Sequence, residues 1–281
     1  MKIVFLGSSH NVFPIIEGLK NNFELDLVIT TESEEKASII PFCQSKGIEV
    51  IRVKDKLELE NLKEIKILKP DLGIVADFGI IITDKTLKHF KRGVLNIHPS
   101  LLPKYRGPTP VQSAILNADT KTGVSIIKLD EKMDHGPILV QEERQISPDD
   151  TAQSLYEILF REGARLLQEA IEPYTKGKII LKEQNHDLAT FTKTLTRQSG
   201  YVNVAEMPDF KILDRMTRAY FPWPGVWTRT KISKTEEKII KFLPFKAAQV
   251  ESKQEMTYKD FLNGYPQADF KLLEFLKNAD A

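Results

Sequence analysis

Cysteine is nearly absent from this chain, since Cys43 is the single cysteine in 281 residues. One thiol cannot form an intramolecular disulfide, and it cannot supply a metal site that is built from several thiolates. The opening residues, "MKIVFLG", form too short an apolar stretch for a signal peptide and are typical of a first strand. We therefore expect a protein of the reducing cytoplasm.

Long apolar runs and an excess of charge are also missing. No stretch is apolar over the roughly 18 residues that a membrane-spanning helix needs, so no membrane partner is expected. The 40 Lys and Arg residues balance 39 Asp and Glu residues, which gives a net charge of +1. Overall charge therefore gives no evidence for nucleic-acid binding, although a locally basic surface stays compatible with the sequence.

Several catalytic signatures are absent as well. The turn "GSSHNV" after the first strand holds only Gly7 of a G-x-G-x-x-G pattern, which disfavours a nicotinamide-dependent enzyme. Ser100 does not lie in the G-x-S-x-G motif of many hydrolases. The histidines form no H-x-H or H-x-x-x-H pair, so no metal is predicted; a site assembled in space from His98, His135 and Asp134 remains the open alternative.

Strand and helix signals alternate through the first half of the chain. Apolar runs predict strands over residues 2–7, 25–30, 48–53, 71–79 and 93–98. Helical spacing of apolar residues predicts helices over residues 12–20, 39–47 and 59–69. Such alternation predicts an α/β fold, with a doubly wound, Rossmann-like and mostly parallel sheet that carries helices on both faces.

Two further strands and the clearest amphipathic helix follow. The strands are expected over residues 122–130 and 136–146, and the helix over residues 151–177. Thr151 or Asp150 can cap the start of this helix, and Gly177 ends it.

The pattern changes beyond about residue 205. A "PWPG" turn precedes two short strands of mixed polarity, and residues 258–277 predict a terminal pair of helices. We therefore expect an α/β domain over residues 1–190, a linker over 191–207, and a small, reduced β-rich domain over 208–281. This last domain would be barrel-like, in the manner of a truncated OB fold.

Polar side chains gather where the expected strand 93–98 ends, in the stretch "VLNIHPSLLPKYRG". The ligand crevice of a parallel sheet lies beyond the carboxyl ends of its strands. Because side chains alternate along a strand, Asn96 and His98 should point to the same face. An amide donor beside an imidazole is suited to stabilising an oxyanion while a proton moves.

A carboxylate in the loop "KLDEKMDHGPILV" could complete this pair. Asp134 near His98 would orient the imidazole and stabilise its protonated form. Asp130 and Glu131 lie in the same loop, and spacing alone does not choose among the three.

Two segments together resemble one enzyme family. "GVLNIHPSLLPKYRGPTPVQSAIL" and "TGVSIIKLDEKMDHGPIL" are similar to the formyltransferases that use 10-formyltetrahydrofolate as co-substrate. The resemblance implies that Asn96, His98 and Asp134 are catalytic and that the loop at residues 77–80 lines the pterin pocket. It also implies contacts to folate from Ser100, Leu101, Leu102 and Pro103.

Later segments resemble one branch of that family. Residues 191–204, 218–228 and 256–265 are similar to the branch that formylates initiator methionyl-tRNA for translation initiation, and the chain is too long for the purine-pathway branch. That branch carries a basic loop where this chain has "TTESEEKASII", and its C-terminal barrel is larger. The stretch 229–242 supplies Arg229, Lys231, Lys234, Lys238 and Lys241 as candidate phosphate contacts. We expect a monomer with folate and this tRNA as partners.

Three alternatives stay open at this stage. A nucleotide-sugar N-formyltransferase shares the catalytic residues and needs no basic loop. A formyltetrahydrofolate hydrolase would transfer the formyl group to water, although it normally has an additional N-terminal domain. A folate- or RNA-binding module without catalysis would have no need of Asn96, His98 and Asp134 together.

Overall fold

The computed structural model describes residues 1–31 and 39–280 of the chain. It divides into two compact units, which are treated separately below. The first unit comprises residues 1–110, 121–145 and 156–192, and the second comprises residues 111–120, 146–155 and 193–281. The division into residues 1–190, 191–207 and 208–281 stays a prediction.

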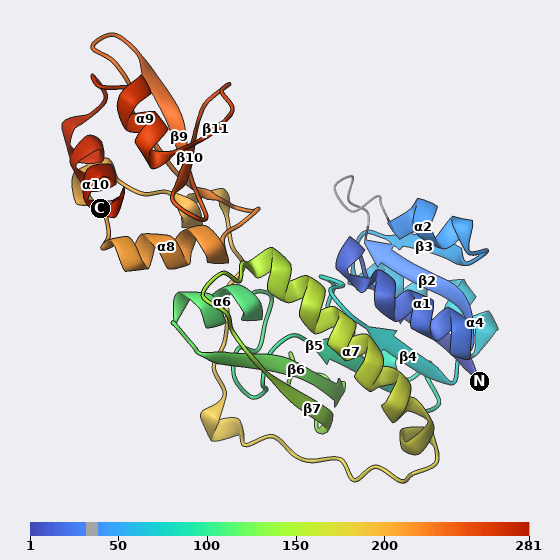
Figure 1. Ribbon diagram of the computed structural model, residues 1–281. Helices are drawn as coiled ribbons and strands as arrows, with labels where there is room; N and C mark the ends of the chain where they lie inside the picture. Colours follow the sequence, from blue (N-terminus) through green and yellow to red (C-terminus); the bar gives the residue numbers. More distant parts are fainter. Residues whose placement is uncertain (32–38, 281) are drawn as a thin grey trace. The chain divides into compact units, whose positions relative to one another are not determined.

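A seven-stranded sheet forms the centre of the first unit, in the order β3-β2-β1-β4-β5-β6-β7 (Figure 1). The strands are β1 (Lys2–Leu6), β2 (Glu24–Thr31), β3 (Glu49–Val53), β4 (Leu72–Val75), β5 (Val94–His98), β6 (Lys121–Lys128) and β7 (Ile138–Gln145). The strands β1 to β5 pair in parallel, whereas β6 and β7 are antiparallel. This topology confirms the mostly parallel Rossmann-like sheet, and its strand order reverses between β1 and β4, where such sheets bind ligands.

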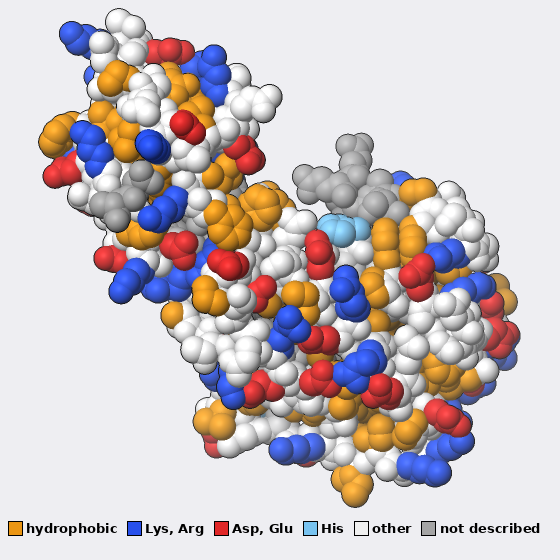
Figure 2. Space-filling model, viewed as in Figure 1, with side chains coloured by type: hydrophobic (Ala, Val, Ile, Leu, Met, Phe, Trp, Pro, Cys, Tyr) orange, Lys and Arg blue, Asp and Glu red, His pale blue; other side chains and the backbone are white. Residues whose placement is uncertain are grey.

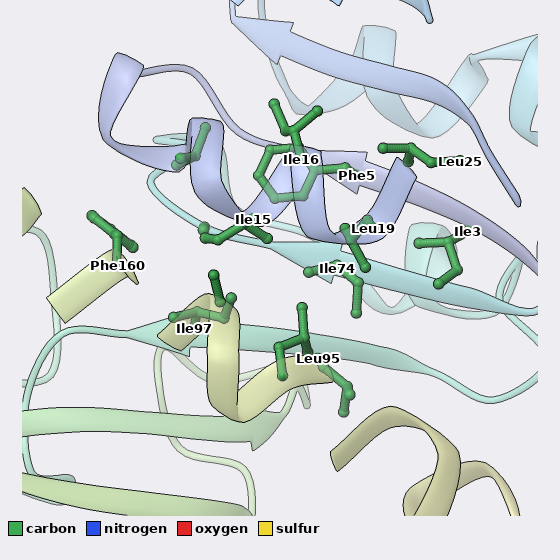
Figure 3. Close-up of a cluster of buried hydrophobic side chains, with 14 of the residues drawn as sticks. Ile3, Phe5, Ile15, Ile16, Leu19, Leu25, Ile74, Leu95, Ile97 and Phe160 are labelled. Carbon is green, nitrogen blue, oxygen red and sulfur yellow. The ribbon is translucent and has the colours of Figure 1, made fainter. Parts of the chain in front are cut away.

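Helices cover both faces of this sheet. One face is covered by α1 (Phe13–Asn22), α2 (Ile39–Ser45) and α7 (Ala152–Thr175), and the other by α3 (Lys56–Asn61), α4 (Lys63–Leu68) and α5 (Asp84–Leu87). Figure 3 shows the first interface, in which side chains of β1, β4 and β5 meet α1 and Phe160 of α7. Apolar side chains on both faces are the burial that stabilises a parallel sheet.

The expected helix over residues 59–69 is wrong in one respect, because it is two short helices. Asp55 caps α3 by accepting from the N–H groups of Leu57 and Glu58, so this helix starts earlier than predicted. Leu62 then takes a non-helical conformation (φ −59°, ψ 114°) between α3 and α4. The break allows Leu59 and Ile65 to be buried in the same apolar cluster.

The long helix α7 begins and ends as the sequence indicates. Thr151 Oγ1 accepts from the N–H of Ser154 at 3.2 Å, and the Thr151 N–H donates to Ser154 Oγ at 3.1 Å. Gly177 follows the helix with φ +67°, the left-handed conformation that glycine adopts easily. These contacts satisfy backbone groups that have no partner within the helix.

The second unit contains a four-stranded antiparallel sheet in the order β11-β10-β9-β8. Its strands are β8 (Val226–Lys231), β9 (Glu237–Leu243), β10 (Ala247–Val250) and β11 (Glu255–Thr257), and its helices include α6 (Pro110–Leu116), α8 (Phe210–Ala219), α9 (Tyr258–Gly264) and α10 (Phe270–Asp280). The expected strands and the terminal helical pair are confirmed. In the part of the chain that is described, β8 and β11 are the two edges of the sheet.

Charged side chains of both signs are interspersed on the face of the molecule that Figure 2 shows. Figure 2 shows Lys and Arg alternating with Asp and Glu over the face in view, in line with the net charge of +1. No described helix is both long and apolar enough to cross a bilayer. Cys43 of α2 is fully buried, and this burial raises the pKa of its thiol to about 11.

Ile97 connects the core to the polar end of β5, because it lies between Asn96 and His98 and points to the opposite face. It is 1% exposed and belongs to the cluster beneath α7. We predict that Ile97→Ala lowers the free energy of unfolding by about 2–5 kcal/mol, because apolar burial is reduced and a cavity is left. Ile67→Ala is the control, since Ile67 is 79% exposed, and should change stability by less than about 0.5 kcal/mol. Both free energies of unfolding can be measured by urea denaturation. Equal losses in Ile97→Ala and Ile67→Ala would contradict the packing of Ile97.

Candidate active site

Asn96 and His98 are at the carboxyl end of β5, which is where the sequence places them. Both are buried, with 9% and 4% of their surfaces exposed. Leu95 and Ile97, which alternate with them along β5, pack into the hydrophobic cluster, so the strand separates core residues from polar ones. One strand thus supplies both a rigid support and two functional groups.

Asp134 reaches these residues from the loop between β6 and β7. Asn96 Nδ2–H donates to Asp134 Oδ1 at 3.1 Å, and the backbone N–H of Gly107 donates to Oδ2 at 2.8 Å. His98 Nδ1 lies 3.7 Å from the same Oδ2, beyond hydrogen-bond distance but within reach of an ion pair when the imidazole is protonated. The structure therefore brings together Asn96, His98 and Asp134.

The imidazole of His98 is oriented differently from the expectation. Its Nε2 lies 2.9 Å from the carbonyl oxygen of Tyr105, and because a carbonyl can only accept, Nε2 carries a hydrogen. The ring is therefore held by Tyr105, while Nδ1 faces Asp134. The three acids of the loop lie in different surroundings: Asp134 lies beside Asn96 and His98, whereas Asp130 pairs with His135 at 2.6 Å and Glu131 is exposed.

Left-handed backbone conformations cluster around the carboxylate. Asp134 has φ +49° and Tyr105 has φ +60°, which are uncommon for residues other than glycine. Gly107 has φ +111°, and a Cβ at this position would lie 2.8 Å from Thr192 Oγ1. Such strained positions persist where the surroundings hold them, and they concentrate at functional sites.

The Ser100–Pro103 segment follows β5 directly and is fixed by the neighbouring strands. Ser125 Oγ donates to the carbonyl of Ser100 at 2.6 Å and accepts from the N–H of Leu102 at 3.1 Å. Gln141 Nε2 donates to the carbonyl of Leu102 at 3.0 Å. Leu102 is 3% exposed and packs against Ile127 and Ile138, so this segment is rigid beside the site.

The loop at residues 77–80 lies after β4, at the same edge of the sheet. Asp77 and Gly79 have positive φ angles of 48° and 80°, and the N–H of Ser8 donates to the carbonyl of Asp77 at 3.1 Å. Phe78 is buried in the adjacent apolar cluster. A hollow of about 510 Å³ borders the amino end of β5 and the loop between β6 and β7; its lining includes Gly93, Val94 and His135 but not Asn96, His98 or Asp134.

Sequence reasoning did not single out the residues that support the site. They are Tyr105, Arg106, Gly107, Ser125, Gln141 and Gln184. Arg106 is 3% exposed, and burial lowers the pKa of its guanidinium against the opposing charges of Asp134 and Asp130. The signal that could have found Arg106 is its position in "KYRG", directly after the SLLP stretch.

The three candidate metal ligands do not assemble. His135 bonds to Asp130 and stacks on His186, with ring centroids 4.0 Å apart. Across residues 1–31 and 39–280, no three His, Cys, Asp or Glu side chains come together as a potential metal site.

Known proteins of similar sequence and structure point to one class of enzyme. Residues 1–171 match the model of a family described as formyl transferase. A methionyl-tRNA formyltransferase of Roseiflexus sp. (strain RS-1) is 40% identical over 238 residues, which is 81% of this chain and 73% of that protein.

Solved structures share the fold at lower identity. An N-formyltransferase of Helicobacter canadensis, in complex with folinic acid and dTDP-3-aminofucose, gives a TM-score of 0.63 at 23% identity, covering 86% of this chain and 95% of that one. Methionyl-tRNA formyltransferase of Clostridium thermocellum gives a TM-score of 0.59 at 18% identity, covering 91% and 96%.

The family match and the sequence relatives thus show an enzyme that transfers a formyl group. Because the family model spans more than half of the chain, and a relative at 40% identity covers most of it, the chain belongs to the formyl transferase family.

We predict that Asn96→Ala and His98→Ala each lower the turnover of formyl transfer by about 10²–10³-fold, as expected when an oxyanion donor is removed. Circular dichroism should show an intact fold, because both side chains lie at the end of β5 and outside the apolar clusters. Near-wild-type turnover in either variant would contradict the catalytic assignment.

Proposed function

We propose that this enzyme transfers the formyl group of 10-formyltetrahydrofolate to the amine of initiator methionyl-tRNA. The observation that carries the proposal is the contact of Asn96, His98 and Asp134 at the carboxyl end of β5. The identity of 40% to a methionyl-tRNA formyltransferase supports this acceptor. Translation initiation is the process served, and we expect a cytoplasmic monomer.

The chemistry requires a nucleophile, an oxyanion site and a path for one proton. The amine nitrogen forms a bond to the formyl carbon, and the carbonyl oxygen takes up the displaced electron pair. Collapse of the tetrahedral intermediate breaks the bond between carbon and N10 of the folate. One proton leaves the amine and one arrives at N10, so the step is balanced.

Asn96 and His98 are the proposed donors to the oxyanion. The Asn96 amide has a second N–H besides the one that it donates to Asp134. Because His98 Nε2–H is engaged by Tyr105, His98 can donate from Nδ1 only when it is protonated. Its charge then lies 3.7 Å from Asp134 Oδ2, which balances it. We assign to Asp134 the acceptance of the amine proton, directly or through water.

The folate co-substrate would lie between the Ser100–Pro103 segment and the loop at residues 77–80. The first is held rigid by Ser125 and Gln141, and the second presents main-chain groups in left-handed conformations. The folinic acid in the Helicobacter canadensis structure supports a folate in this family. Two rigid segments in contact with the folate would hold its formyl carbon in a fixed position relative to Asn96 and His98.

The outer face of β8 and β9 is our candidate surface for the tRNA. Arg229, Lys231 and Lys241 are exposed on this face, and Lys241 pairs across the strands with Trp227. Trp227 donates from its indole to the carbonyl of Arg197 at 3.0 Å, so it is structural here. Lysine and arginine contacts to phosphates would position the tRNA without selecting its sequence.

A nucleotide-linked amino sugar is the second candidate acceptor. It is favoured by the acidic stretch "TTESEEKASII", although residues 32–38 of that stretch lie outside the described residues. The Helicobacter canadensis enzyme supports this candidate only through a shared fold, because its identity is 23%.

The acceptor can be identified by direct comparison. We predict that the protein with 10-formyltetrahydrofolate formylates methionyl-tRNA and leaves dTDP-amino sugars unmodified. Mass spectrometry of the acceptors and absorbance of the released tetrahydrofolate measure both products. If the sugar is formylated and the tRNA is not, the acceptor is a nucleotide-linked amino sugar and the proposal is wrong. Release of tetrahydrofolate in buffer alone would indicate a hydrolase.

Salt dependence tests the tRNA surface. We predict that the triple variant Arg229→Gln, Lys231→Gln, Lys241→Gln binds methionyl-tRNA more weakly, because fewer phosphates are neutralised. The slope of log affinity against log salt should become smaller, by about one for each phosphate that is no longer neutralised. The charge-matched control changes Lys63, Lys66 and Lys69 around α4 to Gln, which should leave the slope unchanged. Equal slopes of log affinity against log salt in the two triple variants would show that this face of β8 and β9 does not contact the tRNA.

A further inference from the structure

Two buried polar side chains beside the site have no part in the proposed chemistry. Arg106 is 3% exposed and Gln184 is 5% exposed. Burying a charged and an amide side chain is costly unless their hydrogen bonds are satisfied. Both side chains lie next to the loop of Asp134, so their burial can stabilise the conformation of that loop.

Gln184 uses every polar group of its side chain. Its Nε2 donates to the carbonyl oxygens of Asp134 and Gly136, at 2.9 and 2.7 Å. Its Oε1 accepts from Nε and Nη2 of Arg106, at 3.2 and 2.7 Å. Because an amide offers two donors and one acceptor, no other side chain of this length reproduces the set.

The turn that Gln184 holds is strained and tightly packed. Asp134 has φ +49°, a conformation that L-residues seldom adopt. A Cβ at position 136 would lie 1.9 Å from the carbonyl oxygen of Lys128, so the turn lies directly against the end of β6. The amide of Gln184 binds two carbonyls of this turn and replaces the solvent that would otherwise hydrate them.

Arg106 connects this turn to the other contact of the carboxylate. Its guanidinium bonds to Gln184 and, through Nη2, to His186 Nδ1 at 2.8 Å. Its backbone is fixed against a neighbouring segment, since its N–H donates to Thr190 O and its carbonyl accepts from the Thr192 N–H. The next residue, Gly107, donates to Asp134 Oδ2.

We propose that Gln184 and Arg106 are positioning residues that hold Asp134 in register with Asn96 and His98 for formyl transfer. Gln184 fixes the backbone of the strained turn. Arg106 fixes the backbone next to Gly107, whose N–H donates to the Asp134 carboxylate. The inference rests on the proposed function only where turnover is measured. The position of Asp134 is a property of the free enzyme and can be measured without substrate.

The substitution Gln184→Glu separates positioning from simple stabilisation. Glutamate still accepts from Arg106, with an added charge attraction, but it has no N–H for the carbonyls of Asp134 and Gly136. Gln184→Met removes both the hydrogen bonds to Arg106 and those to the carbonyls of Asp134 and Gly136. Asn22→Leu is the control, because Asn22 also donates its amide to a backbone carbonyl, that of Gly18, at the carboxyl end of α1.

For Gln184→Glu we expect turnover to fall about 10–100-fold, as for a misplaced catalytic group, with the KM values for folate and methionyl-tRNA unchanged. Its melting temperature should exceed that of Gln184→Met, while the control keeps full turnover. In ¹⁵N NMR of the free protein, the His98 imidazole signals should shift in Gln184→Glu and stay in place in the control.

Unchanged turnover and unchanged His98 signals in Gln184→Glu would overturn the proposal and leave Gln184 as a stabilising residue only. A wild-type enzyme that formylates neither acceptor would instead overturn the proposed function. The NMR comparison needs no substrate, so it would still decide whether Gln184 positions Asp134.

Discussion

The buried carboxylate of Asp134 is the group on which the site depends. A carboxylate that is 9% exposed must be hydrogen-bonded, and here the donors are Asn96 at 3.1 Å and the backbone of Gly107 at 2.8 Å. These bonds join the end of β5, the loop after the SLLP stretch and the loop between β6 and β7. His98 Nδ1 lies 3.7 Å from the same carboxylate, and the Tyr105 carbonyl holds the other side of its ring. Three segments distant in sequence are thereby fixed around one acceptor.

This arrangement is possible because β5 is rigid. Its Leu95 and Ile97 side chains are held in the cluster beneath α1 and α7, which leaves Asn96 and His98 no freedom to turn away. The support continues in the backbone, since Asp134, Tyr105 and Gly107 all have positive φ angles. Strain of this kind lowers stability, and packing elsewhere in the sheet offsets it. Catalytic groups that are held before substrate arrives need no reorganisation during the reaction.

Much of this architecture was predictable from local pattern. Alternating apolar runs indicated the parallel sheet, and the two-residue spacing of Asn96 and His98 indicated their shared face. The break at Leu62 was not predictable, because helical spacing continues through it and only tertiary burial of Leu59 and Ile65 decides the conformation. Gln184 was equally hidden, since it lies 50 residues from its partner Asp134 and a single glutamine carries no periodic signal. Tyr105 contributes a carbonyl, which the sequence does not distinguish from any other.

We propose that Asn96 and Asp134 act as one unit in formyl transfer, whichever amine accepts the group. The most direct test is a double-mutant cycle with Asn96→Ala, Asp134→Asn and the double variant, measured as turnover. Residues that act as a unit give strongly non-additive losses. We expect the double variant to lose no more turnover than the more impaired single variant. Losses that multiply in the double variant would show independent roles and contradict the account.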